Sequence, residues 1–416
     1  MSMKYYGLNG NKLFGYPFIV FSLIIYIYFL KINYFPVYLI LPYLLFGLFI
    51  FVFEVVKNGL RKKYFYYFLL VIISGAWSLV SFVLNIDSDL FYVKENLLLS
   101  LILFFSAFSI KKIYKILDVD FNFENIVLFS SLALVFQLIF SLVVNFVPSI
   151  FNTTIQIINI DGLSSDTLQN FSEARLVGIG ASFFAAGILN SFFLILLAYY
   201  INYSKGKKNY FLLLTLFLII SIVGILFSRT TIIGIVLSIF FFLNYKNLFK
   251  VVLLIFPLFF LLIIYGKTLS ESNAQIAFGL DFLFNTKNSQ ASSSFNGLKE
   301  MYDILPDNLK TWILGDAKYK VVSQNGDFSS YYKETDVGYF RIVFYNGLVG
   351  LLLFFFMTFY ILKKSFYFSG FLIFVLLLCF FALNLKGVAT IYSFCFLFFL
   401  VDSALYGDSL RGNMRS

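Results

Sequence analysis

The sequence Lys333-Glu334-Thr335-Asp336-Val337-Gly338-Tyr339-Phe340-Arg341 joins a polar segment to an apolar one. The polar segment is an insert at 267–337, and apolar runs flank it at 249–265 and 338–362. A polar segment of roughly 70 residues, where the other connections are far shorter, is typical of a small domain or lid rather than a linker. The sequence therefore predicts a membrane protein with one large insert outside the bilayer.

Composition supports the membrane class and excludes several functions. The chain of 416 residues is 61% hydrophobic and only 12% charged, whereas soluble domains carry about twice that charge. The net charge of +10 is interpreted as an excess of Lys and Arg in cytoplasmic loops, so no nucleic acid is expected as a partner. Cys379 and Cys395 lie in apolar runs and indicate no disulfide framework. The chain has no histidine, which excludes the commonest general base and metal ligand.

Apolar runs predict an all-α polytopic membrane protein with about 12 transmembrane helices, each close to the ~20 residues that cross a bilayer. We expect three regions: helices one to nine within 1–265, a periplasmic loop or lid at 266–337, and helices ten to twelve with a tail at 338–416. The spans are expected at 14–30, 37–56, 64–84, 92–110, 125–147, 176–201, 210–227, 230–245, 249–265, 338–362, 366–384 and 388–405. The first is expected to be an uncleaved span.

Basic residues orient these spans. With the N-terminus in the cytoplasm, Lys and Arg gather in the cytoplasmic connections, among them 57–63, 111–115 and 205–208. Cytoplasmic loops carry such an excess in membrane proteins. Both termini are therefore predicted to be cytoplasmic. The insert at 267–337 and the connection at 148–175 are predicted to lie on the opposite, periplasmic or extracellular side.

Three arginines are predicted at the outer ends of spans: Arg175, Arg229 and Arg341. Each could be a residue whose side chain reaches the lipid headgroups, but positive-inside statistics disfavour arginine on this side. The planar guanidinium binds phosphate oxygens with two hydrogen bonds, so a lipid pyrophosphate would fit a ring of them. Arg229 lies in the turn Ser228-Arg229-Thr230, where a helix start would strengthen an anion site.

Acidic residues precede the span at 338–362. Asp336 is either an ordinary helix N-cap or a carboxylate that takes a proton from a sugar hydroxyl or orients it. Glu334 lies beside it. Arg341 follows Asp336 by five residues and is not on the same helix stripe, so the two are expected to contact different parts of a substrate.

An amphipathic helix is predicted at 295–305, because Leu298, Met301, Tyr302 and Leu305 have the spacing of one helix face. Lying on the membrane, this helix would cover the site. Its Lys299 is either solvated or faces the anion. Small residues at 178–187 indicate close helix packing or, as the second reading, a substrate groove.

The residues at 335–341, followed by Tyr345-Asn346-Gly347-Leu348-Val349-Gly350, resemble the signature after the large periplasmic loop of O-antigen polymerases of the Wzy type. Ser228-Arg229-Thr230 resembles a turn shared by these polymerases and the O-antigen ligases. Ile313-Leu314-Gly315 and Arg175-Leu176-Val177-Gly178 are similar to two further short motifs. The resemblance covers about residues 175–351.

The resemblance implies an all-helical (GT-C-like) glycosyltransferase of the bacterial inner membrane. It would join undecaprenyl-pyrophosphate-linked oligosaccharide units into lipopolysaccharide O-antigen on the periplasmic side, with a chain-length regulator as an expected partner. We expect Asp336, Arg229 and Arg175 to be catalytic. Substrate binding is expected from Arg341, Lys299, Glu334 and Tyr339. No metal or cofactor is expected, because pyrophosphate is already a good leaving group.

Two alternatives remain open. A lipid-linked oligosaccharide flippase can have the same number of spans, although transporters usually show charges deep within spans. An O-antigen ligase shares the turn around Arg229, but the ligase relatives carry a histidine near the position of Asp336. The chain also departs from the polymerase pattern, since the insert at 267–337 contains no arginine.

Overall fold

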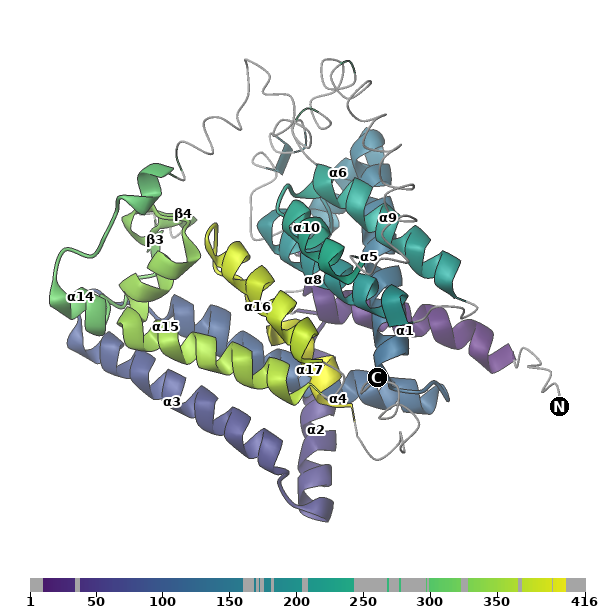
Figure 1. The fold of residues 1–416 in the computed structure, drawn as a ribbon, viewed down its shortest axis with the longest axis horizontal. Helices are drawn as coiled ribbons and strands as arrows, with labels where there is room; N and C mark the ends of the chain where they lie inside the picture. The colour runs from purple at the N-terminus through teal and green to yellow at the C-terminus, as the bar shows by residue number, and fades with distance from the viewer. Residues whose placement is uncertain are drawn as a thin grey trace.

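The computed structural model describes most of the chain. The described residues are 10–33, 38–159, 168, 169, 172, 176–180, 183–203, 209–242, 268, 277, 297, 299–322, 328–365, 369–390 and 392–401. Figure 1 shows a mainly helical molecule in which α3 (Lys62–Leu84) and α15 (Gly338–Lys364) run side by side. The described part of the chain therefore confirms the predicted helical class.

Seven helices in the described ranges are long and apolar enough to cross a membrane. They are α2 (Leu41–Asn58), α3, η1 with α4 (Val93–Ile116), α5 (Phe123–Phe146), α8 (Phe183–Tyr203), α9 (Tyr210–Phe227) and α15. Shorter apolar helices are Gly15–Tyr28, which is part of α1 (Gly10–Tyr28), together with α10 (Thr231–Phe242), α16 (Gly370–Asn384) and α17 (Tyr392–Phe399). Every predicted span except 249–265, which lies outside the described residues, overlaps one of these helices. The total of about 12 spans stays a prediction.

Capping side chains and small residues explain several of the boundaries and contacts. Asn122 accepts a hydrogen bond from the Asn125 amide at the start of α5, with an N–O distance of 2.8 Å, as N-cap residues commonly do. Gly47 lets α2 approach the backbone of α4, since a Cβ there would lie 1.9 Å from the Phe105 carbonyl oxygen. Small residues at such contacts are typical of membrane helices.

The small residues at 178–187 serve packing. A Cβ on Gly187 would lie 1.8 Å from Thr230 Oγ1, and a Cβ on Gly178 would lie 2.3 Å from Gln137 Nε2. The interpretation as close packing is therefore confirmed at these positions. The helix itself begins at Phe183, not at 176 as predicted. Ser141 Oγ and Asn145 Nδ2 donate hydrogen bonds to the carbonyl oxygen of Val177 instead.

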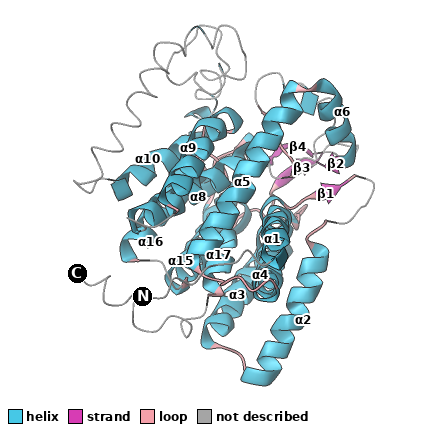
Figure 2. Cartoon of the chain, turned by 90° about the vertical axis from the view of Figure 1, so that its right-hand side faces the viewer, coloured by secondary structure: helices cyan, strands magenta, loops and turns pink. Residues whose placement is uncertain are grey.

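Two short antiparallel ribbons were not predicted. One pairs β1 (Lys31–Ile32) with β2 (Ile158–Asn159), beside α6 (Pro148–Ile157). The other pairs β3 (Lys320–Val322) with β4 (Phe328–Tyr331) and contains a register shift between Val321 and Val322. Both ribbons lie in the upper part of Figure 2, but Figure 1 shows that β3 and β4 are well separated from α6. Each joins segments that were predicted to lie on the same side of the membrane.

Contacts at the two ends of α3 separate the charged segments into two groups. Near its start, Lys63 Nζ donates to the Phe399 carbonyl oxygen at 2.5 Å, and Lys111 Nζ donates to that of Leu400 at 3.2 Å. Beyond its last residue, Asn85 Nδ2 donates to the Gly315 carbonyl oxygen at 3.0 Å. The basic connections and the polar insert thus meet opposite ends of one long helix, as the charge pattern predicts.

Candidate functional site

The described residues 299–322 and 328–337 of the insert form a compact unit, here called the insert core, at the ends of α3 and α15. It contains α14 (Leu309–Ile313), β3, β4 and the 3-10 helix η2 (Tyr332–Glu334). The chain turns at Gly315, which has a φ of +79°. Asn308 caps α14 by accepting from the Thr311 amide at 2.8 Å.

A kink in α15 creates the surface on which the insert core packs. Gly347 has a non-helical conformation, with φ 64° and ψ −171°, so the carbonyls one turn earlier need other partners. Trp77 Nε1 donates to the Asn346 carbonyl oxygen at 2.8 Å, and the Ala317 amide donates to that of Tyr345 at 3.1 Å. The kink at Gly347 therefore allows both α3 and the insert core to form hydrogen bonds with the backbone of α15.

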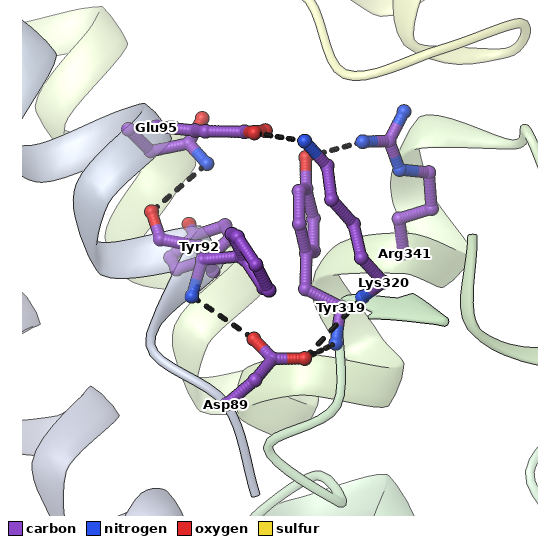
Figure 3. A network of polar contacts seen from close by, with 8 residues as sticks. Asp89, Tyr92, Glu95, Tyr319, Lys320 and Arg341 are labelled. Carbon is purple, nitrogen blue, oxygen red and sulfur yellow. Dashed lines mark hydrogen bonds and ion pairs between the residues drawn. The ribbon is translucent and has the colours of Figure 1, made fainter. Parts of the chain in front are cut away.

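A polar network holds the insert core to the connection between α3 and α4, as Figure 3 shows. Asp89 Oδ2 accepts from the Tyr319 amide at 2.7 Å, and Lys320 forms an ion pair with Glu95. Glu95 belongs to η1 (Val93–Leu98), a π-helical start to α4. Hydrogen bonds to charged groups are stronger than neutral ones, so this network fixes the position of β3.

Arg341 belongs to the same network. Its side chain is buried, with Nη2 donating to Tyr319 Oη at 2.6 Å. The guanidinium carbon lies 3.3 Å from the ring centre of Tyr331 and 4.6 Å from that of Tyr319. Burial raises the pKa of Tyr319 to about 12, although the nearby Arg341 charge opposes the shift. Arg341 is thus a buried contact between α15 and the insert core, not a residue on an open vestibule.

Asp336 has different surroundings. It is exposed, and the N-cap position of α15 is occupied by Val337, so Asp336 is not the helix cap. Its backbone amide donates to Met301 Sδ at 3.4 Å. Within the described residues its carboxylate has no hydrogen-bond or ion-pair partner. The geometry therefore does not support the interpretation of Asp336 as a helix N-cap. It leaves the carboxylate available for a ligand.

A helical segment at 299–302 lies beside Asp336, and it ends at Tyr302, not at 305 as predicted. Tyr302 Oη donates to the Leu385 carbonyl oxygen at 2.6 Å, and the Tyr302 ring lies 5.9 Å from that of Phe340. Lys299 is exposed on the same segment. The structure therefore brings this part of the insert onto α15 and the end of α16.

Two other predicted binding residues lie at the same place, here called the junction, where the insert core meets the start of α15 and the end of α16. Glu334 is exposed and has a φ of 54°, in the left-handed region that non-glycine residues rarely adopt. Tyr339 is half-buried, and its hydroxyl donates to the Phe381 carbonyl oxygen at 2.7 Å. The exposed part of this junction thus holds Asp336, Glu334 and Lys299.

Arg229 is connected to this junction by continuous packing. A Cβ on Gly338 would lie 2.4 Å from the Gly387 carbonyl oxygen, and one on Gly387 would lie 2.6 Å from Phe184. One turn further along α8, Gly187 meets the turn that contains Arg229. In that turn, Ser228 Oγ and Thr230 Oγ1 are 2.7 Å apart. Arg175 lies outside the described residues.

Sequence reasoning missed Asp89 and Glu95, which hold the insert core in place. Asp89 lies in the connection between α3 and α4, which would be external in the predicted topology, and Glu95 lies in η1 at the start of α4. Aspartates in a short connection between two spans were the available signal that this connection has a polar partner. Their partners Tyr319 and Lys320 are more than 200 residues away in the chain, so the pairing could not be read from spacing.

Comparisons of the chain with protein-family models, with curated proteins and with solved structures find no match.

Proposed function

We propose that the protein is an O-antigen polymerase that joins lipid-pyrophosphate-linked oligosaccharide units. The observation that carries the proposal is the exposed carboxylate of Asp336 at the start of α15, which has no partner among the described residues and lies beside the 299–302 segment of the insert. A carboxylate in this place would act on a sugar hydroxyl delivered at the membrane surface. The continuous packing from α15 to the turn at Arg229 supports a shared site.

The reaction would join an acceptor hydroxyl to the anomeric carbon of the donor sugar. The new glycosidic carbon–oxygen bond forms as the bond from that carbon to the pyrophosphate oxygen breaks. Asp336 takes the hydroxyl proton, and the polyprenyl pyrophosphate leaves with the bonding electron pair. Positive charge at Arg229 and Arg175 would stabilise the charge that develops on the leaving group.

The remaining residues have supporting roles in this proposal. Lys299 and Glu334 are exposed near Asp336 and would contact the sugars or the diphosphate. Tyr339 and Arg341 would act indirectly. Tyr339 is bonded to α16, and Arg341 is stacked between two tyrosines of the insert core. We therefore propose Arg341 as a residue that positions the insert core, in place of direct substrate binding.

The test uses purified protein in lipid vesicles with lipid-linked repeat units of its source organism. Wild type is expected to produce a ladder of longer glycans without another protein. Asp336→Asn is expected to lower the rate by about 10²-fold or more, and Arg229→Ala by about 10²–10³-fold. Asp118→Asn and Arg61→Ala, which change the other end of the molecule, serve as matched controls and are expected to leave the rate unchanged.

The same assay separates the alternative functions. A ligase would lengthen nothing until a second acceptor is added, and a flippase would move the lipid across the bilayer without changing any bond. A full ladder from Asp336→Asn and Arg229→Ala would remove the site assignment. If folded wild-type protein produces no ladder, the proposal that the protein is a polymerase would be rejected.

A further inference from the structure

A polar cavity of about 280 Å³ lies between the insert core and the end of α3. Its walls come from three distant parts of the chain: the residues after α3, the segment from Asp307 to Lys333, and Phe344 near the start of α15. Small-molecule sites in proteins begin at roughly 300 Å³, so the cavity has room for a ligand of about one sugar ring. It is lined by Asn85, Asn308, Thr311, Asp316, Lys318 and Tyr332, among others.

The charges of this cavity balance. Asp307 and Asp316 contribute two carboxylates, while Lys318 and Lys333 contribute two ammonium groups. Lys333 Nζ lies 3.3 Å from Asp307 Oδ2, so one pair is already formed. A cation or an anion would gain little from a lining of zero formal charge. The arrangement favours a neutral ligand that offers both hydrogen-bond donors and acceptors.

The polar groups are held in place before any ligand binds. Asp316 Oδ1 accepts from Thr311 Oγ1 at 2.6 Å, and Asp316 Oδ2 accepts from Tyr332 Oη at 3.3 Å. Asn85 is held by its bond to the Gly315 carbonyl oxygen. Each carboxylate and hydroxyl oxygen can accept a second hydrogen bond. Binding would therefore cost little side-chain ordering.

Aromatic surface accompanies these polar groups. The rings of Tyr332 and Phe344 lie 5.8 Å apart and nearly perpendicular, at 85°. Both line the cavity, together with Ile86. Most of the lining is polar, and these rings add a small apolar surface to it. A sugar ring matches this mixture, because it presents hydroxyls at its rim and carbon-bound hydrogens on its faces.

The cavity adjoins the proposed reaction site. Lys333 is on its wall, and Asp336 follows three residues later. Three residues of extended chain span at most ~11 Å, a distance of about two sugar rings. A sugar in this cavity would therefore lie within about two sugar rings of the sugar that reacts at Asp336.

We propose that this cavity binds one neutral sugar residue of the oligosaccharide unit, next to the sugar that reacts at Asp336. Its place in the reaction rests on the proposed function, but its binding of saccharide does not. The site would select repeat units by recognising a sugar that is remote from the glycosidic bond that forms. Binding energy from such a remote group can position the reacting sugar.

The experiment measures saccharide binding directly, with the full-length protein in detergent and a printed array of neutral and charged glycans. Wild type is expected to bind a subset of neutral glycans. Asp316→Asn and Tyr332→Phe are each expected to weaken the tightest of these by about tenfold, the effect of one lost hydrogen bond. Tyr360→Phe is the matched control, since its hydroxyl bonds to the Lys63 carbonyl oxygen at the opposite end of α3, and it is expected to bind like wild type.

Binding and catalysis then separate the two proposals. The sugar site is supported if Asp336→Asn and Arg229→Ala bind the same glycans as tightly as wild type while Tyr332→Phe binds them about tenfold more weakly. That result would stand even if no ladder forms, in which case only the polymerase would be lost. The sugar site is overturned if wild type binds no glycan above background. It is also overturned if Asp316→Asn and Tyr332→Phe bind as tightly as Tyr360→Phe.

Discussion

At the scale of single residues, the burial of Arg341 and the exposure of Asp336 separate two roles that the sequence places together. The guanidinium contacts two tyrosine rings and one hydroxyl, whereas the carboxylate faces outward. A buried charge is costly unless its surroundings compensate it. Aromatic faces and a hydroxyl supply part of that compensation, while the buried Nε of Arg341 has no hydrogen-bond partner among the described residues. Arg341 thus contributes to the contact between α15 and the insert core.

Arg341→Lys should therefore destabilise the protein although it keeps the charge. An ammonium group cannot stack on Tyr331 as a planar guanidinium does, and the expected loss is about 1–2 kcal/mol of unfolding free energy. Thermal unfolding of the purified protein in detergent measures it. Arg61→Lys, an exposed arginine at the other end of α3, should change the unfolding free energy by less than about 0.5 kcal/mol. Equal stability of the two variants would contradict the packing role.

The hydroxyl of Tyr332 should lose its proton only at a higher pH than an ordinary tyrosine. Burial and the neighbouring Asp316 carboxylate raise the pKa of its hydroxyl to about 12, from about 10 in model compounds. Because the folded-state pKa is raised, its contribution to stability is complete below pH 10 and is lost as the pH rises through about 12. The difference in tyrosinate absorbance between wild type and Tyr332→Phe measures the titration. A midpoint near 10 would show that the contact with Asp316 is not formed.

At the scale of elements, two glycines allow α15, α14 and the insert core to approach one another. A Cβ on Gly347 would lie 2.1 Å from the Ile313 carbonyl oxygen, and one on Gly315 would lie 2.3 Å from Tyr345. Both glycines have positive φ, a region that favours glycine. The backbones touch because neither position carries a side chain.

Gly347→Ala should consequently weaken the attachment of the insert core. The positive φ alone costs on the order of 1–3 kcal/mol for a residue with a side chain, and the collision with Ile313 adds to it. Gly370→Ala is the control, because a Cβ there meets nothing within 4 Å. Limited proteolysis of the insert measures the effect: faster cleavage is expected in Gly347→Ala only. Equal cleavage rates would show that the kink tolerates a side chain.

At the scale of the whole molecule, the contacts sort the connections into two ends. The segments near 63, 111 and 399 meet at one end of α3, while those near 85, 315 and 345 meet at the other. In a membrane protein these two ends would face different compartments. The arrangement thus agrees with the predicted alternation of basic and non-basic connections.

Cysteine labelling in whole cells tests this arrangement. Cys379 and Cys395 are buried, so background labelling should be low. Leu309→Cys, at an exposed position in α14, should react with a membrane-impermeant maleimide added outside the inner membrane. Lys364→Cys, exposed at the end of α15, should react only after the membrane is opened. Labelling of both from the same side would reject the topology.

Apolar length was sufficient to determine the class of this protein and the positions of most helices, because a bilayer imposes that constraint locally along the chain. The sides of the connections stay a prediction from charge. Motif order likewise singled out Asp336 and Gly347. The tertiary structure alone decided that Arg341 is buried and that Asp89 and Glu95 hold β3. It also created the cavity around Asp316. These features arise from contacts between residues that are far apart in the sequence, and no local pattern encodes such contacts.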